Sequence, residues 1–159
     1  MTFNQNIIDE MIRCPKRMIK KPLPWKADRG QYRTEFELQS IDEQHFFTVF
    51  GRYNEKFNEN FSFGLVYFPK HEKSSFEIIR CNGPHGEHKQ FPHHIYYHIH
   101  KATEQNIESG LKENSTVEIT ESYTTFDESF RFFVKYINVI KSDVDSAFPH
   151  KQGSLFDPL

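Results

Sequence analysis

Apolar residues recur along the chain at two spacings, and each spacing predicts a different kind of element. Four apolar residues between positions 7 and 12 follow helical spacing, which predicts a short amphipathic helix over residues 5–13. A second helix is predicted over residues 126–140, where Thr125 and Glu128 can form a capping box. The apolar face of this second helix consists of Phe126, Phe130, Phe133, Val134, Ile137 and Ile140. A short helix that ends at Gly110 is expected between them.

Five segments between the two main helices have the pattern of β-strands. In the first of them, Tyr32, Thr34, Phe36 and Leu38 alternate with polar residues, as a half-buried strand requires. The five segments are residues 31–41, 45–53, 61–69, 74–81 and 94–101. Because the connections between them are short and polar, the strands are expected to pair in antiparallel fashion.

These elements together predict an α+β fold. We expect a single domain over residues 1–141, in which an N-terminal and a C-terminal helix pack on one face of an antiparallel sheet of about five strands. Residues 142–159 are expected to form a C-terminal tail outside the core. The length of 159 residues fits one domain, and 17 phenylalanines and 7 tyrosines can supply its core.

Composition also limits where the protein can act. No apolar run has the length of a membrane span, and the first residues lack the layout of a signal peptide, so no membrane partner is expected. The two cysteines, Cys14 and Cys81, are too few for a disulfide framework. We therefore expect a cytoplasmic location.

Charge is unevenly distributed, although the formal net charge is only -2. Between Arg13 and Arg33, eight basic residues face one acidic residue, Asp28. Such a segment favours a polyanionic partner, RNA or another nucleic acid, although short basic clusters also occur on ordinary surfaces. The candidate nucleic-acid-binding residues are Arg13, Lys16, Arg17, Lys20, Lys21, Arg29 and Arg33.

Six of the nine histidines lie between positions 85 and 100, namely His85, His88, His93, His94, His98 and His100. Alternate residues of a strand share a face, so His98 and His100 are expected on an open face and Ile99 on the core face. The turn-rich sequence NGPHGEH could fold over that open face. The candidate catalytic residues are His85, His88, His98, His100, Arg80, Lys101 and Glu104.

These residue types suit cleavage of RNA without a cofactor. Two histidines can serve as general base and general acid near neutral pH. Arg80 or Lys101 can stabilise the charge on the phosphate, and Glu104 can orient an imidazole. Exposed rings of Trp25, Tyr32 or Tyr96 can stack on bases.

Two alternatives to this chemistry stay open. In the first, His88, His98 and His100 bind zinc or another divalent transition metal, because a strand H-x-H pair can supply two ligands. In the second, the histidines only bond main-chain carbonyls and stabilise a turn.

At these residues the chain resembles known proteins. The sequence RCNGPHGEH, followed by HIHKATE and a Thr-capped helix, is similar to a family of uncharacterised small bacterial proteins over most of the chain. A shorter stretch, with Asn82, His85, His93 and His94, resembles the TumE-like toxins of bacterial toxin–antitoxin modules. That resemblance implies an RNA-cleaving toxin that an antitoxin protein neutralises. The HIH sequence of residues 98–100 is not part of the toxin pattern.

The tail carries a separate motif. QGSLF resembles the pentapeptide by which many bacterial replication and repair proteins dock on the sliding clamp, with Gln152, Leu155 and Phe156 as the contact residues. This motif leads to a further hypothesis, a non-catalytic interaction module that docks a partner protein through its tail and its histidine face.

Overall fold

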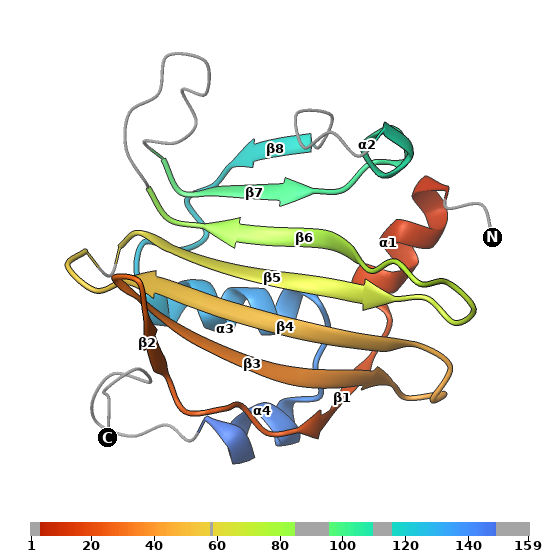
Figure 1. The fold of residues 1–159 in the computed structure, drawn as a ribbon, viewed down its shortest axis with the longest axis horizontal. Helices are drawn as coiled ribbons and strands as arrows, with labels where there is room; N and C mark the ends of the chain where they lie inside the picture. The colour runs from red at the N-terminus through yellow and green to blue at the C-terminus, as the bar shows by residue number, and fades with distance from the viewer. Residues whose placement is uncertain (1–3, 58, 85–95, 110–115, 149–159) are drawn as a thin grey trace.

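The computed structural model describes residues 4–57, 59–84, 96–109 and 116–148. In these residues, eight β-strands form a single antiparallel sheet in the order β1-β3-β4-β5-β6-β7-β8, and β2 also pairs with β3 (Figure 1). The strands are β1 (Lys16–Lys20), β2 (Lys26–Asp28), β3 (Gln31–Ser40), β4 (Phe46–Asn54), β5 (Phe61–Phe68), β6 (Phe76–Asn82), β7 (His98–Lys101) and β8 (Thr116–Ile119). The helices are α1 (Gln5–Arg13), α2 (Glu104–Ser109), α3 (Phe126–Tyr136) and α4 (Lys141–Ala147).

The two main helices begin where the sequence signals predict. The side chain of Asn4 accepts a hydrogen bond from the backbone N–H of Ile7 at 2.9 Å, and α1 covers the predicted residues. Thr125 accepts a bond from the backbone N–H of Glu128 at 3.1 Å at the start of α3. This helix ends at Tyr136 rather than at residue 140, because Asn138 adopts a left-handed backbone conformation with φ 63°.

The α+β class and the antiparallel sheet are confirmed, whereas the number of about five strands is too low. The five predicted segments correspond to β3, β4, β5, β6 and β7, of which β7 is the shortest, with four residues. The strands β1, β2 and β8 were not predicted. Two of these three, β1 and β8, form the two ends of the sheet, so the additional strands extend the predicted sheet without changing its centre.

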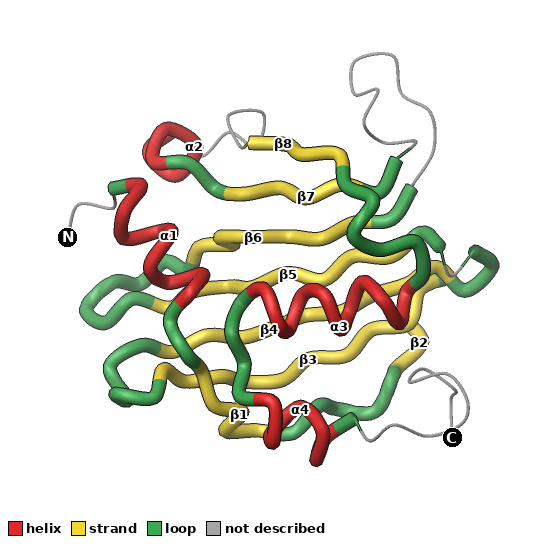
Figure 2. Tube along the Cα trace, turned by 180° about the vertical axis from the view of Figure 1, so that it is seen from behind, coloured by secondary structure: helices red, strands yellow, loops and turns green. Residues whose placement is uncertain are grey.

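Helices α1, α3 and α4 pack on one face of the sheet (Figure 2). The core between the layers is aromatic, since Phe63 of β5 stacks on Phe126 of α3 with ring centroids 4.9 Å apart. Within the described residues, no helix lies over the opposite face, which is turned toward the viewer in Figure 1.

Part of the predicted tail belongs to this core. Residues 142–147 lie in α4 and Phe148 caps its C-terminus, and the side chains of Val144 and Phe148 are buried. The Phe148 ring lies 4.5 Å from the Phe130 ring and 6.0 Å from the Phe36 ring. The sequence SDVDSAF contains only two large apolar residues, so its helical contact with the core was not apparent. In the part of the chain that is described, no helix combines the length and apolar character that crossing a membrane requires.

Candidate functional site

The face of the sheet opposite the helices, here called the open face, carries two neighbouring rows of side chains set by the strand register. One row runs across five strands through Arg33, Arg52, Ser62, Asn82 and His98. The next row runs in parallel through Glu35, Phe50, Gly64, Arg80 and His100. Arginine, amide and imidazole side chains from strands far apart in sequence therefore meet on one surface.

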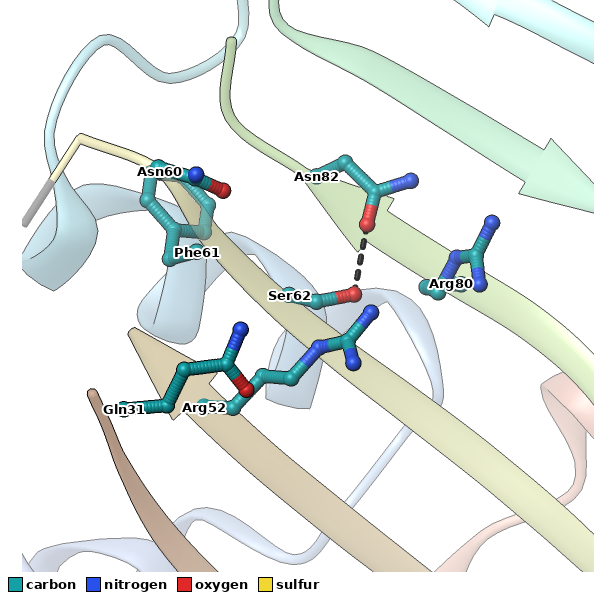
Figure 3. Close-up of a pocket in the computed structure, with 7 residues that line it drawn as sticks. All are labelled: Gln31, Arg52, Asn60, Phe61, Ser62, Arg80 and Asn82. Atoms are coloured by element: carbon teal, nitrogen blue, oxygen red, sulfur yellow. Dashed lines mark hydrogen bonds between the residues drawn. The ribbon is translucent and has the colours of Figure 1, made fainter. Parts of the chain in front are cut away.

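A cavity of about 250 Å³ lies on this face and is called the arginine pocket here. Its lining is mainly polar and comes from β3, β4, β5, β6 and the turn before β5 (Figure 3). The lining residues are Gln31, Arg52, Asn60, Phe61, Ser62, Arg80 and Asn82. In Figure 3, the side chain of Arg52 extends from β4 over β5 toward Arg80.

A β-bulge places an acidic residue beside Arg80. The register of β5 and β6 shifts between Leu65 and Val66, so that Glu77 and Arg80 face the same side of the sheet. The Arg80 Nε and the Glu77 Oε1 lie 3.6 Å apart, and the Arg80 Nε is buried without a hydrogen-bond partner. Glu77 therefore offsets part of the Arg80 charge but leaves a donor unused.

The positive charge of Arg52 is not paired with any acidic side chain that the structure describes, unlike those of Arg33 and Arg80. Its guanidinium group is half-buried and, among the described residues, forms neither an ion pair nor a hydrogen bond. Burial lowers the pKa of Arg52, the positive charges of Arg80 and Arg33 lower it further, and Glu77 acts in the opposite direction. Arg33 itself is paired with Asp28 at 3.5 Å. The arginine pocket thus concentrates positive charge that an anion would neutralise.

A buried polar chain fixes one wall of the pocket. Ser62 donates to the Asn82 Oδ1 at 2.5 Å, which turns the Asn82 Nδ2 toward the His98 Nε2 at 3.3 Å. The His98 Nδ1 donates to the Tyr96 carbonyl at 2.7 Å. Because the Nδ1 must carry the hydrogen for that bond, the Nε2 accepts from Asn82, and the ring is neutral in this arrangement.

The expectation that His98 lies exposed on an open face is therefore wrong. Its side chain points to the open face, but it has an exposed fraction of 0% and both of its ring nitrogens are bonded. The polar chain through Asn82 and Ser62 makes that burial possible, since buried polar groups require partners. The structure thus gives His98 a role in positioning Asn82.

The other candidate catalytic residues are divided by the sheet. His100 is half-buried on the open face, directly opposite Arg80, and its ring lies 5.0 Å from that of His98. Lys101 follows it on the other face, where its Nζ lies 5.0 Å from the Tyr136 ring centroid of α3. Glu104 begins α2 and contacts Gln5 of α1 through its backbone N–H. The structure therefore places Arg80 and His100 together and Lys101 and Glu104 elsewhere.

Several candidates lie outside the described residues. These are His85, His88, His93, His94 and the tail residues Gln152, Leu155 and Phe156. The metal alternative needs His88 with His98 and His100. Over residues 4–57, 59–84, 96–109 and 116–148, no three side chains of metal-binding type converge, and His98 would have to give up its bond to Asn82 to bind a metal.

The basic segment is only partly a surface feature. Lys16 is fully buried, and its Nζ donates to the carbonyls of Ile12, Cys14 and Ile137, so its assignment as a surface residue for nucleic acid is wrong. The Arg17 Nε lies 3.7 Å from the Asp143 carboxylate. Arg13, Lys20, Lys21, Arg29 and Arg33 are exposed, and of these Arg33 belongs to the first row of the open face.

Sequence reasoning missed Arg52, Gln31, Asn60 and Ser62 as pocket residues. The period-two pattern identifies Arg52 only as a polar residue on the side away from the core. Comparisons with protein-family models, with curated proteins and with solved structures find no match for this chain. The resemblance to TumE-like toxins through Asn82, His85, His93 and His94 therefore stays a prediction.

Proposed function

We propose that the protein binds RNA on the open face of its sheet and cleaves it with histidine acid–base chemistry. The observation that carries the proposal is the arginine pocket, where Arg52 and Arg80 lie half-buried without full neutralisation and His100 stands opposite Arg80. Guanidinium groups bind phosphate oxygens through charge-assisted hydrogen bonds, often in pairs. A cytoplasmic location and an antitoxin partner are part of the same proposal.

An aromatic ring beside the arginines supports a single-stranded ligand. A Cβ atom added at Gly64 would lie 2.2 Å from Phe50, so the half-buried Phe50 ring covers this glycine in the row that contains Arg80. Aromatic rings next to basic side chains provide stacking surfaces for the unpaired bases of RNA.

The proposed reaction uses Arg80 and His100 in different roles. A base removes the proton of the 2′-hydroxyl, whose oxygen forms a bond to phosphorus while the bond from phosphorus to the 5′-oxygen breaks and an acid protonates that oxygen. His100 carries out one of these proton transfers, and Arg80 stabilises the negative charge on the phosphorane. His85 or His88, outside the described residues, is the proposed partner for the other transfer.

The test uses labelled single-stranded RNA, with binding measured by fluorescence anisotropy and cleavage by gel electrophoresis. His100→Ala is expected to slow cleavage by about a hundredfold or more while binding changes little. Arg80→Gln is expected to weaken both binding and cleavage. The matched control is His71→Asn, because His71 is exposed in a turn and asparagine tolerates its φ of 68°.

The outcomes separate the function classes. Equal cleavage by the wild type and by His100→Ala would refute the role of His100. Binding of RNA without cleavage by the wild type would favour the non-catalytic interaction module. Arrest of growth when the protein is produced in bacteria, relieved by His100→Ala, would support the toxin assignment.

A further inference from the structure

We infer that the arginine pocket is a site for a phosphate monoester, such as the terminal phosphate of an RNA strand or the phosphate of a free nucleotide. The RNA source of this group rests on the proposed function, whereas recognition of the phosphate itself does not. The structure supports this ligand class by charge, by hydrogen-bond donors and by size.

The charge of the pocket matches a dianion. Arg52 and Arg80 bring two positive charges. The carboxylate of Glu77 lies 3.6 Å from Arg80, but one third of the Glu77 side chain is exposed, and solvent therefore weakens the compensation of the Arg80 charge by Glu77. A phosphate monoester carries about -1.5 to -2 at pH 7, whereas an internal phosphodiester carries one negative charge. The monoester therefore neutralises the two guanidinium groups more completely.

The donors of the pocket also exceed what its own residues use. Within the described part of the chain, the Arg52 guanidinium and the side-chain amides of Gln31 and Asn60 have no hydrogen-bond partner. The Arg80 side chain also lines the cavity, although its Nε is itself buried beside Glu77. These donors come from four strands or turns that face one cavity, and a monoester offers three terminal oxygens to accept from them.

Asn82 adds a donor whose orientation is set in advance. One of its two amide hydrogens points to the His98 Nε2, and its oxygen accepts from Ser62. The second amide hydrogen takes part in neither bond, and Asn82 lines the pocket. Because the bonds to Ser62 and His98 hold the amide in place, binding requires little reordering of this side chain.

The size of the pocket favours an end group. A volume of about 250 Å³ lies below the range of about 300–1,000 Å³ that is usual for sites of drug-sized ligands. The pocket is bordered on one side by Asn60 and by Phe61, whose exposed fraction is 2%. A terminal phosphate fits wholly inside such a space, whereas an internal phosphodiester continues in two directions. The phosphodiester to be cleaved is therefore expected at the edge of the pocket, between Arg80 and His100, because His100 is not among the lining residues.

The experiment measures binding by calorimetry to inorganic phosphate, to adenosine monophosphate and to two RNA oligomers that differ only in a 5′-phosphate or a 5′-hydroxyl. The 5′-phosphorylated oligomer is expected to bind at least about tenfold more tightly than the 5′-hydroxyl oligomer. Arg52→Gln should reduce this ratio to near one. Lys135→Gln is the control, because it removes one positive charge from the exposed side of α3 in the helical layer.

Equal affinity of the wild-type protein for the two oligomers, together with no binding of inorganic phosphate or adenosine monophosphate at millimolar concentration, would overturn the inference. Retention of the ratio in Arg52→Gln would also overturn it. Circular dichroism confirms that the variants are folded, and Gln31→Ala gives a second test that keeps both arginines. RNA binding without phosphate selectivity leaves the proposed function intact, whereas binding of small phosphates without RNA binding refutes only the proposed function.

Discussion

Lys16 is expected to stabilise the fold rather than to bind a ligand. Its side chain is fully buried where β1 meets the ends of α1 and α3. The Nζ donates to the carbonyl of Ile12 at 2.9 Å, of Cys14 at 2.8 Å and of Ile137 at 2.7 Å. Its charge also lies 4.9 Å from the centre of the Phe47 ring. Cations at helix C-termini are favourable, so Lys16 stabilises both helix ends.

Replacement of Lys16 by methionine keeps most of the unbranched stem and removes only the ammonium group. The three carbonyl oxygens lose their charged donor, and each buried acceptor left without a partner costs about 1–3 kcal/mol. Part of this loss is offset because the variant no longer removes an ammonium group from water. We expect Lys16→Met to lower the free energy of unfolding by about 2–4 kcal/mol, or the Tm by roughly 6–12 °C.

Urea denaturation followed by fluorescence and circular dichroism measures this change. Lys20→Met is the matched control, because Lys20 is exposed on the same strand and its replacement should alter the free energy by less than about 0.5 kcal/mol. A Lys16→Met protein as stable as the control would refute the structural role. A loss of RNA binding at unchanged stability would instead return Lys16 to the candidate nucleic-acid-binding residues.

The same lysine predicts a dependence on pH. Burial lowers the pKa of Lys16 from 10.5 to about 8. Between these two values the unfolded chain holds the proton more tightly than the folded chain, so the free energy of unfolding rises with pH. The stability gap between the wild type and Lys16→Met should therefore widen between pH 8 and 10.5, by at most about 3 kcal/mol. A gap that stays constant or narrows over this window would contradict the assignment.

Three further changes probe the packing around the site. In Gly83→Ala, the new Cβ would lie 1.8 Å from the Glu59 carbonyl oxygen, so the backbone must move and urea denaturation should show a loss of about 1–3 kcal/mol. Tyr123→Phe removes a buried hydroxyl that bonds carbonyl oxygens of β6 and β7, and the same assay should show a loss of about 1–2 kcal/mol in the free energy of unfolding. An unchanged free energy of unfolding would show that this hydroxyl does not stabilise the sheet. Burial raises the pKa of Cys81 to about 12. Mass spectrometry at pH 8 should therefore show that Cys81 is alkylated more than about a hundredfold more slowly than half-buried Cys14. Equal rates of alkylation would contradict the burial of Cys81.

The parts of the fold that depend on nearby residues were predictable. The bounds of α1 follow from apolar residues at helical spacing, all within ten positions, and the structure adds a cap at Asn4. The burial of Phe36 and Leu38 in β3 follows from simple alternation. In both cases the sequence signal and the contact that it predicts lie within the same short segment.

Two of the missed strands, β1 and β8, depend on residues outside their own segments. The residues of β1 read as a basic segment, yet the Lys16 N–H bonds the Asn138 carbonyl and the Lys16 carbonyl accepts from Ile140. These bonds join positions that lie more than a hundred residues apart. Strand β8 has only four residues and exists as the partner of β7. Neither segment contains enough alternation to be recognised alone.

The candidate site was only partly predictable for the same reason. Arg80 and His100 were identified as candidates from their residue types, but which side chains stand opposite them depends on the pairing of β4, β5, β6 and β7. The register places Asn82 beside His98 and converts an expected catalytic histidine into a buried one. It also brings Arg52 to the pocket.

Alternate positions of one strand serve the two faces of the sheet: in β5, Phe63 packs on the helices, whereas Ser62 lines the arginine pocket. Phe63 and Arg52 lie on adjoining strands, yet Phe63 packs in the core and Arg52 lines the arginine pocket. Mutations on the solvent side can therefore alter ligand preference in single steps while the interior that directs folding is preserved. A sheet built in this way allows descendants of one ancestor to diverge in specificity at little thermodynamic cost.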